Sequence, residues 1–327
     1  MVKALGIFSG GLDSILAAEL LRRQKIEVHC ICFVTPFFDA EKAEQAAKLY
    51  DIPLQVKNIG SEHLAMLKNP RYGYGKNMNP CIDCHAQMFA IAGQVMEEQG
   101  YDFLFSGEVM GQRPKSQVQS ALMSVNKASG QAGRILRPLS AKLLPTTAME
   151  EDGLVDREQL QDFQGRSRKP QEQLAKELGI SEYPSSGGGC ALTENSFSAR
   201  LRDLFEHQPQ CTVVDVELLK LGRPFRLSPQ AKLTLGRNRS NNEALKRVAF
   251  DVGDGAYLLR SCNFSGPLGV VSGDPQLDDL TTAAAIVASY GKGGKESLVE
   301  VLVIHGGKEQ VLTVAPMDRE QSRVIQL

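Results

Sequence analysis

Three of the seven cysteines are spaced so that they could do chemistry together. Cys81 and Cys84 form a Cys-x-x-Cys pair followed directly by His85, and Cys190 follows three glycines. Two thiols three residues apart lie on one loop or on the first turn of a helix, and they could bind one metal ion or cluster. Glycines beside a cysteine leave room for a bulky ligand or a covalent intermediate. We therefore predict that Cys81, Cys84 and Cys190 are catalytic residues and metal ligands.

This spacing leaves three kinds of site open. The thiols could be three ligands of a 4Fe-4S cluster with one iron left open. One thiol could instead carry a persulfide and then form a disulfide with another. A structural zinc is the third alternative, with His85 as its fourth ligand, although ligands that are adjacent in the chain strain a tetrahedral site. A thioredoxin-type pair is disfavoured, because the pair lacks the context of that fold.

A run of small residues near the N-terminus could bind phosphate. It follows an apolar run at 3–8 and opens an amphipathic stretch at 13–23, so it is expected to form a turn between a strand and a helix. Free backbone N–H groups and the helix dipole attract anions at such a place. A simple helix cap on a tight turn is the alternative. We assign to ATP binding the residues of this turn: Ser9, Gly10, Gly11, Leu12, Asp13 and Ser14. Asp13 is also expected to be catalytic by holding the Mg²⁺ of the nucleotide.

Strand and helix patterns alternate through the first half of the chain. We expect strands at 3–8, 28–34, 54–56 and 103–105, and helices at 13–23, 40–50 and 86–99. Such alternation predicts an α/β fold with a doubly wound parallel sheet. Ligands of these sheets bind at the carboxyl ends of the strands, where the turns at 9–11 and 106–108 both lie.

A change of pattern near residue 205 predicts two domains, 1–204 and 205–327. The boundary follows a loop of turn-forming residues at 183–190. The second, smaller domain is expected to be α+β, with strands at 212–219, 232–235, 248–252 and 256–259, a helix at 281–290 and a hairpin of 298–304 with 309–314.

Composition limits the classes of protein that fit. The net charge is −1 and the pI is near 6.5, so a nucleic-acid surface would have to be local. No apolar run approaches the roughly 18 residues that span a bilayer, and no signal peptide is recognisable, which predicts a cytoplasmic protein with no membrane partner. The odd number of cysteines favours reduced thiols. We expect Cys30, Cys32, Cys211 and Cys262 to be structural.

Two stretches are locally basic. Residues 109–149 contain six basic and no acidic residues, and residues 220–247 contain eight basic residues and one acid, Glu243. Contact with RNA phosphates is one use for such charges, and a solvated basic face is the alternative. For Arg137 and Lys142 we expect incidental charges in a solvated loop.

The turn at 9–14, Ser-Gly-Gly-Leu-Asp-Ser, resembles the signature of the PP-loop ATP pyrophosphatases. No Gly-Lys-Ser/Thr follows it, which distinguishes it from a Walker loop. The resemblance implies cleavage of ATP between the α and β phosphates and transfer of AMP to a carbonyl or carboxyl oxygen. An adenylated oxygen leaves readily when a sulfur nucleophile attacks.

Residues 105–117 resemble the corresponding segment of the tRNA 4-thiouridine synthases. The resemblance implies that Gly107, Glu108 and Gln112 line the ATP site, to which we also assign Phe33. It further implies that Arg113 and Lys115 neutralise pyrophosphate or RNA phosphate.

The three cysteines resemble those of the cluster-dependent branch of sulfur-inserting PP-loop enzymes, in which an open iron would hold hydrosulfide. On this resemblance we favour a 4Fe-4S cluster. Residues 79–81 and Cys190 also resemble the 2-thiouridylases, which keeps the persulfide route open.

Residues 235–245 and 265–271 and the helix at 281–290 resemble the RNA-binding module of the NFACT proteins. The resemblance implies a central loop with Gly236 and a grip on folded RNA such as tRNA. We assign to RNA binding Arg237, Asn238, Arg239 and Asn242, besides Arg113 and Lys115. The Gly-Pro-His of that family is Gly-Pro-Leu at 266–268 here, so no role is carried over to its histidine.

These resemblances predict an ATP-dependent tRNA sulfurtransferase. No THUMP-like domain and no rhodanese tail are recognisable, so we expect a carrier protein or inorganic sulfide as sulfur donor. One alternative is a PP-loop ligase or amidotransferase that acts on a small molecule and carries a structural zinc. The other is an RNA-binding factor that only senses nucleotide.

Overall fold

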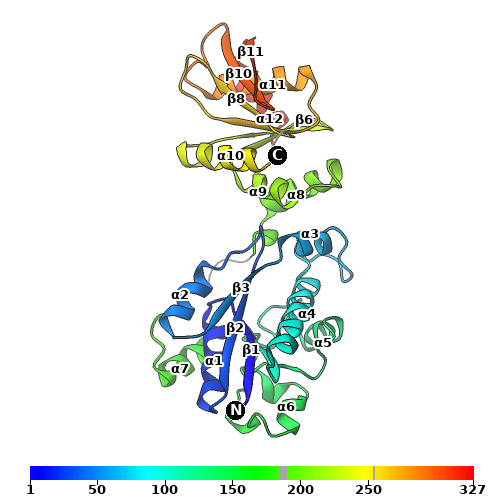
Figure 1. Cartoon of the computed structure of the whole chain (residues 1–327), viewed down its shortest axis with the longest axis vertical. Helices are drawn as coiled ribbons and strands as arrows, with labels where there is room; N and C mark the ends of the chain where they lie inside the picture. The colour runs from blue at the N-terminus through cyan, green and yellow to red at the C-terminus, as the bar shows by residue number, and fades with distance from the viewer. Residues whose placement is uncertain (185–189, 253–254) are drawn as a thin grey trace. The chain divides into compact units, whose positions relative to one another are not determined.

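The computed structural model describes residues 1–184, 190–252 and 255–327, which form two compact units, Met1–Thr193 and Glu194–Leu327 (Figure 1). The sequence places the domain boundary after residue 204, inside helix α8 (Asn195–His207). This helix belongs to the second unit, because Arg200 donates a hydrogen bond to the carbonyl oxygen of Leu219 at 3.1 Å and Asp203 forms an ion pair with Arg226. The glycines 187–189 of the expected loop lie outside the described residues.

The first unit is built on a five-stranded parallel sheet of order β3-β2-β1-β4-β5, which confirms the predicted doubly wound α/β fold. Its elements in chain order are β1 (Lys3–Ile7), α1 (Leu12–Arg23), β2 (Glu27–Val34), α2 (Glu41–Leu49), β3 (Leu54–Asn58), α3 (Gly60–Lys68), α4 (Cys81–Gln99), β4 (Phe103–Ser106), α5 (Gln119–Ala128), β5 (Ile135–Leu136), η1 (Ala141–Leu143), α6 (Ala148–Glu151), η2 (Arg157–Gln159), α7 (Lys169–Leu178) and η3 (Ala191–Thr193).

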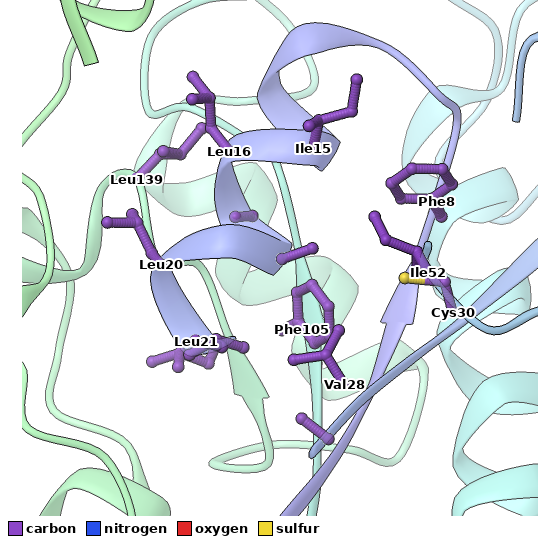
Figure 2. Packing of buried hydrophobic residues seen from close by; sticks show 14 of the residues in the cluster. Phe8, Ile15, Leu16, Leu20, Leu21, Val28, Cys30, Ile52, Phe105 and Leu139 are labelled. Carbon is purple, nitrogen blue, oxygen red and sulfur yellow. The ribbon is translucent and has the colours of Figure 1, made fainter. Parts of the chain in front are cut away.

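Helices cover both faces of this sheet, because successive strand residues point to opposite sides. Phe105 of β4 packs in the core beside α1 (Figure 2). Leu104 packs in the core on the other face, with residues of α4. Cys30 and Cys32 lie on the α1 face and are buried, as expected for structural cysteines. Burial raises the pKa of the Cys32 thiol to about 11, so this thiol stays protonated and unreactive.

The second unit is a smaller α+β domain with a six-stranded antiparallel sheet of order β11-β10-β8-β9-β7-β6. The predicted closing hairpin is confirmed as β10 paired with β11. Besides α8, its elements are α9 (Val213–Lys220), β6 (Arg223–Ser228), β7 (Ala231–Leu235), α10 (Arg239–Val252), β8 (Tyr257–Ser261), β9 (Gly269–Gly273), α11 (Leu277–Tyr290), β10 (Val299–His305), β11 (Lys308–Val314) and α12 (Arg319–Val324).

The sequence-based prediction of two strands is wrong, because both segments are helical in the structure. Residues 212–219 form helix α9, because Thr212 and Asp215 make a capping box that outweighs the strand preference of the valines. Residues 248–252 belong to helix α10, which buries Leu245 and Ala249, four residues apart, against α9 and β9. Helical spacing of apolar residues decides the structure there.

Within the described part of the chain, no helix is both long enough and apolar enough to cross a membrane.

Candidate functional site

The first glycine turn joins β1 to α1 in a conformation that requires glycine at one position. Gly10 has φ of +72°, and a Cβ atom there would lie 2.2 Å from the carbonyl oxygen of Lys42. No side chain caps the N-terminus of α1 at Gly11. The first N–H groups of α1 are therefore oriented toward the turn, where they can bind an anion.

The two signature glycines should respond differently to alanine. We expect Gly10→Ala to abolish stable folding or to lower ATP affinity at least about tenfold, because backbone atoms cannot yield to the new methyl group. Gly11→Ala should change ATP affinity less than about threefold, since its Cβ would meet only Ser9 Oγ at 3.5 Å and φ is −77°. Calorimetric titration with a non-hydrolysable ATP analogue and thermal denaturation measure both. Equal effects of the two substitutions would contradict this geometry.

The second glycine turn packs directly against the first. Gly107 follows β4, which pairs with β1. A Cβ atom on Gly107 would lie 2.5 Å from backbone atoms of both Asp13 and Ser14. The two turns that the sequence singled out are therefore in contact at the carboxyl edge of the sheet.

Asp13 lies at this contact with its carboxylate buried between the two turns. Its Oδ2 accepts a hydrogen bond from Gln112 Nε2 at 2.9 Å, whereas Oδ1 is buried and makes no such hydrogen bond. Burial raises the pKa of the Asp13 carboxyl, against the lowering effects of Gln112, of Arg168, of the Gln171 side chain and of Arg113. A buried carboxylate oxygen of this kind suits a bound Mg²⁺, and the nearby arginines suit the phosphates that accompany it. Arg168, in the charge run before α7, was not among the predicted site residues.

Both carboxylate oxygens of Glu108, which the sequence assigns to the ATP site, are hydrogen-bonded to protein groups. His85 Nδ1 lies 2.8 Å from Oε1, and Oε2 accepts hydrogen bonds from Arg137 Nε at 2.9 Å and Ser106 Oγ at 3.1 Å. Burial alone would raise the pKa of Glu108, but the Arg137 guanidinium and His85 lower it to about 2.

Arg137 is the buried ion-pair partner of Glu108 and not the solvated charge expected from the sequence. Only 2% of the residue is exposed. Its Nη1 donates to Asn126 Oδ1 at 3.0 Å, and its guanidinium lies 5.8 Å from the centre of the Phe89 ring. Lys142, by contrast, forms an ion pair with Glu158 near the surface.

The three predicted cysteines lie near one another. Cys81 and Cys84 are on the first turn of α4, and Cys190 directly precedes η3. All three residues are partly exposed and none of them forms a disulfide. The pKa of the Cys84 thiol lies well above its usual range, mainly through burial and further through the neighbouring Cys190 and Cys81. The fold therefore brings together thiols that are far apart in the sequence.

His63 is a further member of this site, and the sequence offered no signal for it. Its Nε2 lies 3.3 Å from Cys84 Sγ, and its ring packs against those of Phe37 and Phe38. Burial lowers the pKa of His63 to about 4, so the imidazole is neutral at physiological pH. A neutral ring can orient the Cys84 sulfur through one hydrogen bond.

The described residues contain no group of three or more His, Cys, Asp or Glu side chains placed to hold a single metal ion. A zinc ion requires four ligands about 2.0 to 2.3 Å from one centre. A cluster distributes its ligands over several irons, and a persulfide requires only that two sulfurs can meet. Three neighbouring thiols fit both of these alternatives.

One series of contacts joins the nucleotide turn to the cysteines. Gly107 touches Asp13, its neighbour Glu108 contacts His85, and His85 follows Cys84 in the chain. The turns predicted to bind ATP and the cysteines predicted to handle sulfur thus lie on one edge of the sheet.

The other residues assigned to ATP binding occupy different environments. Leu12 and Phe33 are core residues, 1% and 3% exposed. Ser9 Oγ lies 3.4 Å from the backbone nitrogen of Gly11, and Ser14 Oγ donates to the carbonyl oxygen of Gly11 at 2.8 Å. Arg113 and Lys115, assigned to phosphate, are exposed.

In the second unit, the predicted RNA-binding loop separates into exposed and structural residues. Arg237 is exposed, as are Asn238 and Arg239. Asn242 is half-buried and supports the loop, because its Oδ1 accepts a hydrogen bond from the backbone N–H of Leu268 at 3.1 Å. A Cβ atom on Gly236 would lie 1.9 Å from the same Oδ1, which explains the glycine.

Part of the basic stretch 220–247 is not available to phosphate. Arg226 is paired with Asp203, and Lys232 is 1% exposed, with a pKa that burial lowers to about 8. Arg239 forms an exposed ion pair with Glu243 at 3.0 Å. Charge counting along the sequence does not separate such residues from free cations.

Comparisons with known proteins match each unit separately. The chain is 28% identical over 88 residues to the tRNA-specific 2-thiouridylase MnmA of Desulfosudis oleivorans, covering 25% of each protein. It is 28% identical over 151 residues to a tRNA sulfurtransferase of Desulfurococcus amylolyticus, covering 42% of this chain and 29% of that protein. The chain thus spans about a quarter of the length of these curated relatives.

A solved structure of a 4-thiouridine synthetase–RNA complex with bound ATP is 20% identical, with a TM-score of 0.35, and covers 55% of this chain and 52% of that one. Family models match residues 2–142 as "Thiamine biosynthesis protein (ThiI)" and residues 222–324 as "NFACT protein RNA binding domain". Residues 2–142 of the first unit are therefore similar to the ThiI family, and residues 222–324 of the second unit are similar to the RNA-binding domain of NFACT proteins.

Proposed function

We propose that the chain is an ATP-dependent tRNA thiolation enzyme, which adenylates a base oxygen and replaces it with sulfur. The observation that supports this most directly is the series of contacts from Asp13 through Gly107, Glu108 and His85 to Cys84. An activating site and a sulfur site must both reach one atom of the substrate, and adjacent sites on one sheet edge meet that need.

In the proposed first step, the base oxygen attacks the α-phosphate of ATP and the bond to pyrophosphate breaks. The first N–H groups of α1 bind the phosphates, and Asp13 would hold the Mg²⁺ that accompanies them and offsets their charge. Arg168 and the exposed Arg113 and Lys115 neutralise the leaving pyrophosphate.

In the proposed second step, sulfur attacks the activated ring carbon and AMP leaves with the original oxygen. We assign Cys81, Cys84 and Cys190 as the ligands of a 4Fe-4S cluster, which would supply an open iron that binds hydrosulfide. His63 holds the sulfur of Cys84 in place.

The persulfide route uses the same thiols. The terminal sulfur of a persulfide on one cysteine bonds to the base carbon. A second cysteine then breaks the sulfur–sulfur bond and forms a disulfide, which an external thiol reductant must reduce. The cluster route can take hydrosulfide from inorganic sulfide, whereas the persulfide route needs a carrier protein that transfers sulfane sulfur to the cysteine thiol. Both routes require the reduced thiols that a cytoplasm maintains.

The test is the product of the reaction. Purified protein, ATP, sulfide and unmodified tRNA should release pyrophosphate and yield a thiolated nucleoside detectable by mass spectrometry. Cells lacking the gene should lose the same nucleoside. Pyrophosphate release with a small molecule in place of tRNA would support a ligase instead. ATP binding without turnover would support a nucleotide-sensing RNA-binding factor.

Cluster and persulfide are separated by spectroscopy. Anaerobically purified protein with a cluster should be brown and absorb near 400 nm. Colourless protein that still thiolates tRNA would favour the persulfide route.

A further inference from the structure

The loop at 69–80 connects α3 to α4 (Figure 1). It exposes aromatic and basic side chains. Tyr72 is 40% exposed and Tyr74 is 39% exposed. Arg71 and Lys76 beside them are also exposed, and the Arg71 guanidinium lies 5.7 Å from the centre of the Tyr72 ring. None of these residues belongs to the ATP turns or to the three cysteines.

Buried hydrogen bonds hold this loop in one conformation. The carboxylate of Asp83, on the first turn of α4 and 9% exposed, accepts from the backbone N–H groups of Arg71 and Tyr72, both at 3.0 Å. The Tyr74 hydroxyl donates to the carbonyl oxygen of Leu67 at 2.6 Å. A loop fixed at these points presents its rings at little entropic cost on binding.

The same loop contacts both cysteine segments. Asn79 Nδ2 lies 3.4 Å from Cys81 Sγ, and Asn77 Nδ2 donates to the carbonyl oxygen of Thr193 at 2.6 Å. Thr193 in turn contacts Cys190, because its hydroxyl donates to the Cys190 carbonyl oxygen at 2.7 Å. A molecule bound on the loop would therefore lie beside the thiols.

The charge of the segment favours a polyanion. From residue 68 to residue 82 the chain has three basic residues and no acidic residue. Asp83, the next acid, is turned inward to the loop backbone. Exposed aromatic rings among cations are the usual means of binding single-stranded nucleic acid, because rings stack on bases and cations contact phosphates.

We propose that the loop at 69–80 is a stacking platform that binds an unpaired nucleotide of the RNA substrate and presents it to the three cysteines. Tyr72 and Tyr74 supply the rings, and Arg71 and Lys76 contact the flanking phosphates. The inference rests on the proposed function and names the part of the first unit that selects the target nucleotide.

A single fluorescent reporter tests the stacking directly. The chain contains no tryptophan, so Tyr72→Trp introduces one indole at the platform. Stacking on a base should quench its emission when unmodified tRNA is added, and ATP alone should not. Tyr101→Trp, on a partly exposed tyrosine that precedes β4 at the opposite end of the strand, is the matched control and should not respond. Unchanged indole emission from the Tyr72→Trp protein at saturating tRNA would overturn the proposal.

Affinity and kinetics provide the second test. Tyr72→Ala should raise the KM for tRNA on the order of 5- to 100-fold, as expected when one base no longer stacks, whereas Tyr72→Phe should stay within about twofold. The double variant Arg71→Gln with Lys76→Gln should bind tRNA with a weaker salt dependence. The slope of the logarithm of the binding constant against the logarithm of the salt concentration should become shallower by about 0.7 for each phosphate that is no longer neutralised. Lys25→Gln, an exposed cation between α1 and β2, is the charge control.

The outcomes separate this inference from the proposed function. If the wild-type protein thiolates tRNA and the loop variants bind and modify tRNA equally well, the proposal of a stacking platform is wrong and the proposed thiolation function is retained. If the wild-type protein neither binds nor modifies tRNA, both fail. If Tyr72→Ala lowers turnover only with a protein sulfur donor and leaves tRNA affinity unchanged, the loop binds that donor and the RNA inference is overturned.

Discussion

Replacing Cys84 by serine is expected to lower the rate of tRNA thiolation by at least about a thousandfold and to change tRNA-dependent pyrophosphate release by less than about fivefold. Serine keeps the size of the side chain but cannot bind iron or carry sulfane sulfur. The ATP turn is built by other residues, chiefly around Gly107 and Asp13, so activation should survive. Pyrophosphate release and thionucleoside yield, measured in one reaction, separate the two steps.

A second cysteine variant is the control for this experiment. Cys262 is an exposed free thiol of the second unit, and Cys262→Ser should leave both rates unchanged. Normal thiolation by Cys84→Ser protein would remove the three thiols from the mechanism. Loss of pyrophosphate release and thiolation together would mean that the cysteine site also builds the ATP site.

Replacing Glu108 by glutamine should lower the free energy of unfolding at pH 7 by about 3 kcal/mol. The folded-state pKa of Glu108 is lowered from 4.5 to about 2. The stabilisation from this carboxylate is therefore fully present above about pH 4.5 and is lost as the pH falls toward 2. The difference between wild type and variant should shrink over that range, as measured by urea denaturation at several pH values.

The matched control is another glutamate that is paired with arginine. Glu97 forms an ion pair with Arg134 at 2.9 Å, but its side chain is 62% exposed. Solvent screening makes such pairs worth little, so Glu97→Gln should cost less than about 1 kcal/mol at any pH. Similar losses for both variants, or a Glu108 effect that is independent of pH, would contradict the assigned ionisation.

The fold of the first unit could be predicted because the apolar residues of its strands and helices recur at regular spacings along the sequence. Apolar runs became β1, β2 and β4, with glycine turns directly after β1 and β4, and helical spacing gave α1 and α4. In the second unit the β-branched residues around Val213 suggested a strand where a capping box produced a helix. Local propensity is a weak guide where a cap and helical packing act together.

The site was only partly predictable, for a different reason. The two glycine turns and the three cysteines carry motifs, so their proximity could be expected from a parallel sheet. His63, Arg137 and Arg168 carry none, and their roles arise from contacts with residues 21 or more positions away. Such contacts depend on tertiary packing, which a single sequence does not reveal.

The distance along the chain between Cys84 and Cys190 has a consequence for biogenesis. These residues are 106 positions apart, and the segment carrying Cys190 is held by Asn77 and by the backbone of Phe37. During synthesis the thiols of α4 thus emerge from the ribosome long before their partner does. Assembly of the proposed sulfur-handling centre would therefore be a late event in maturation, and a chain truncated before residue 190 would fold its glycine turns yet never gather its third thiol.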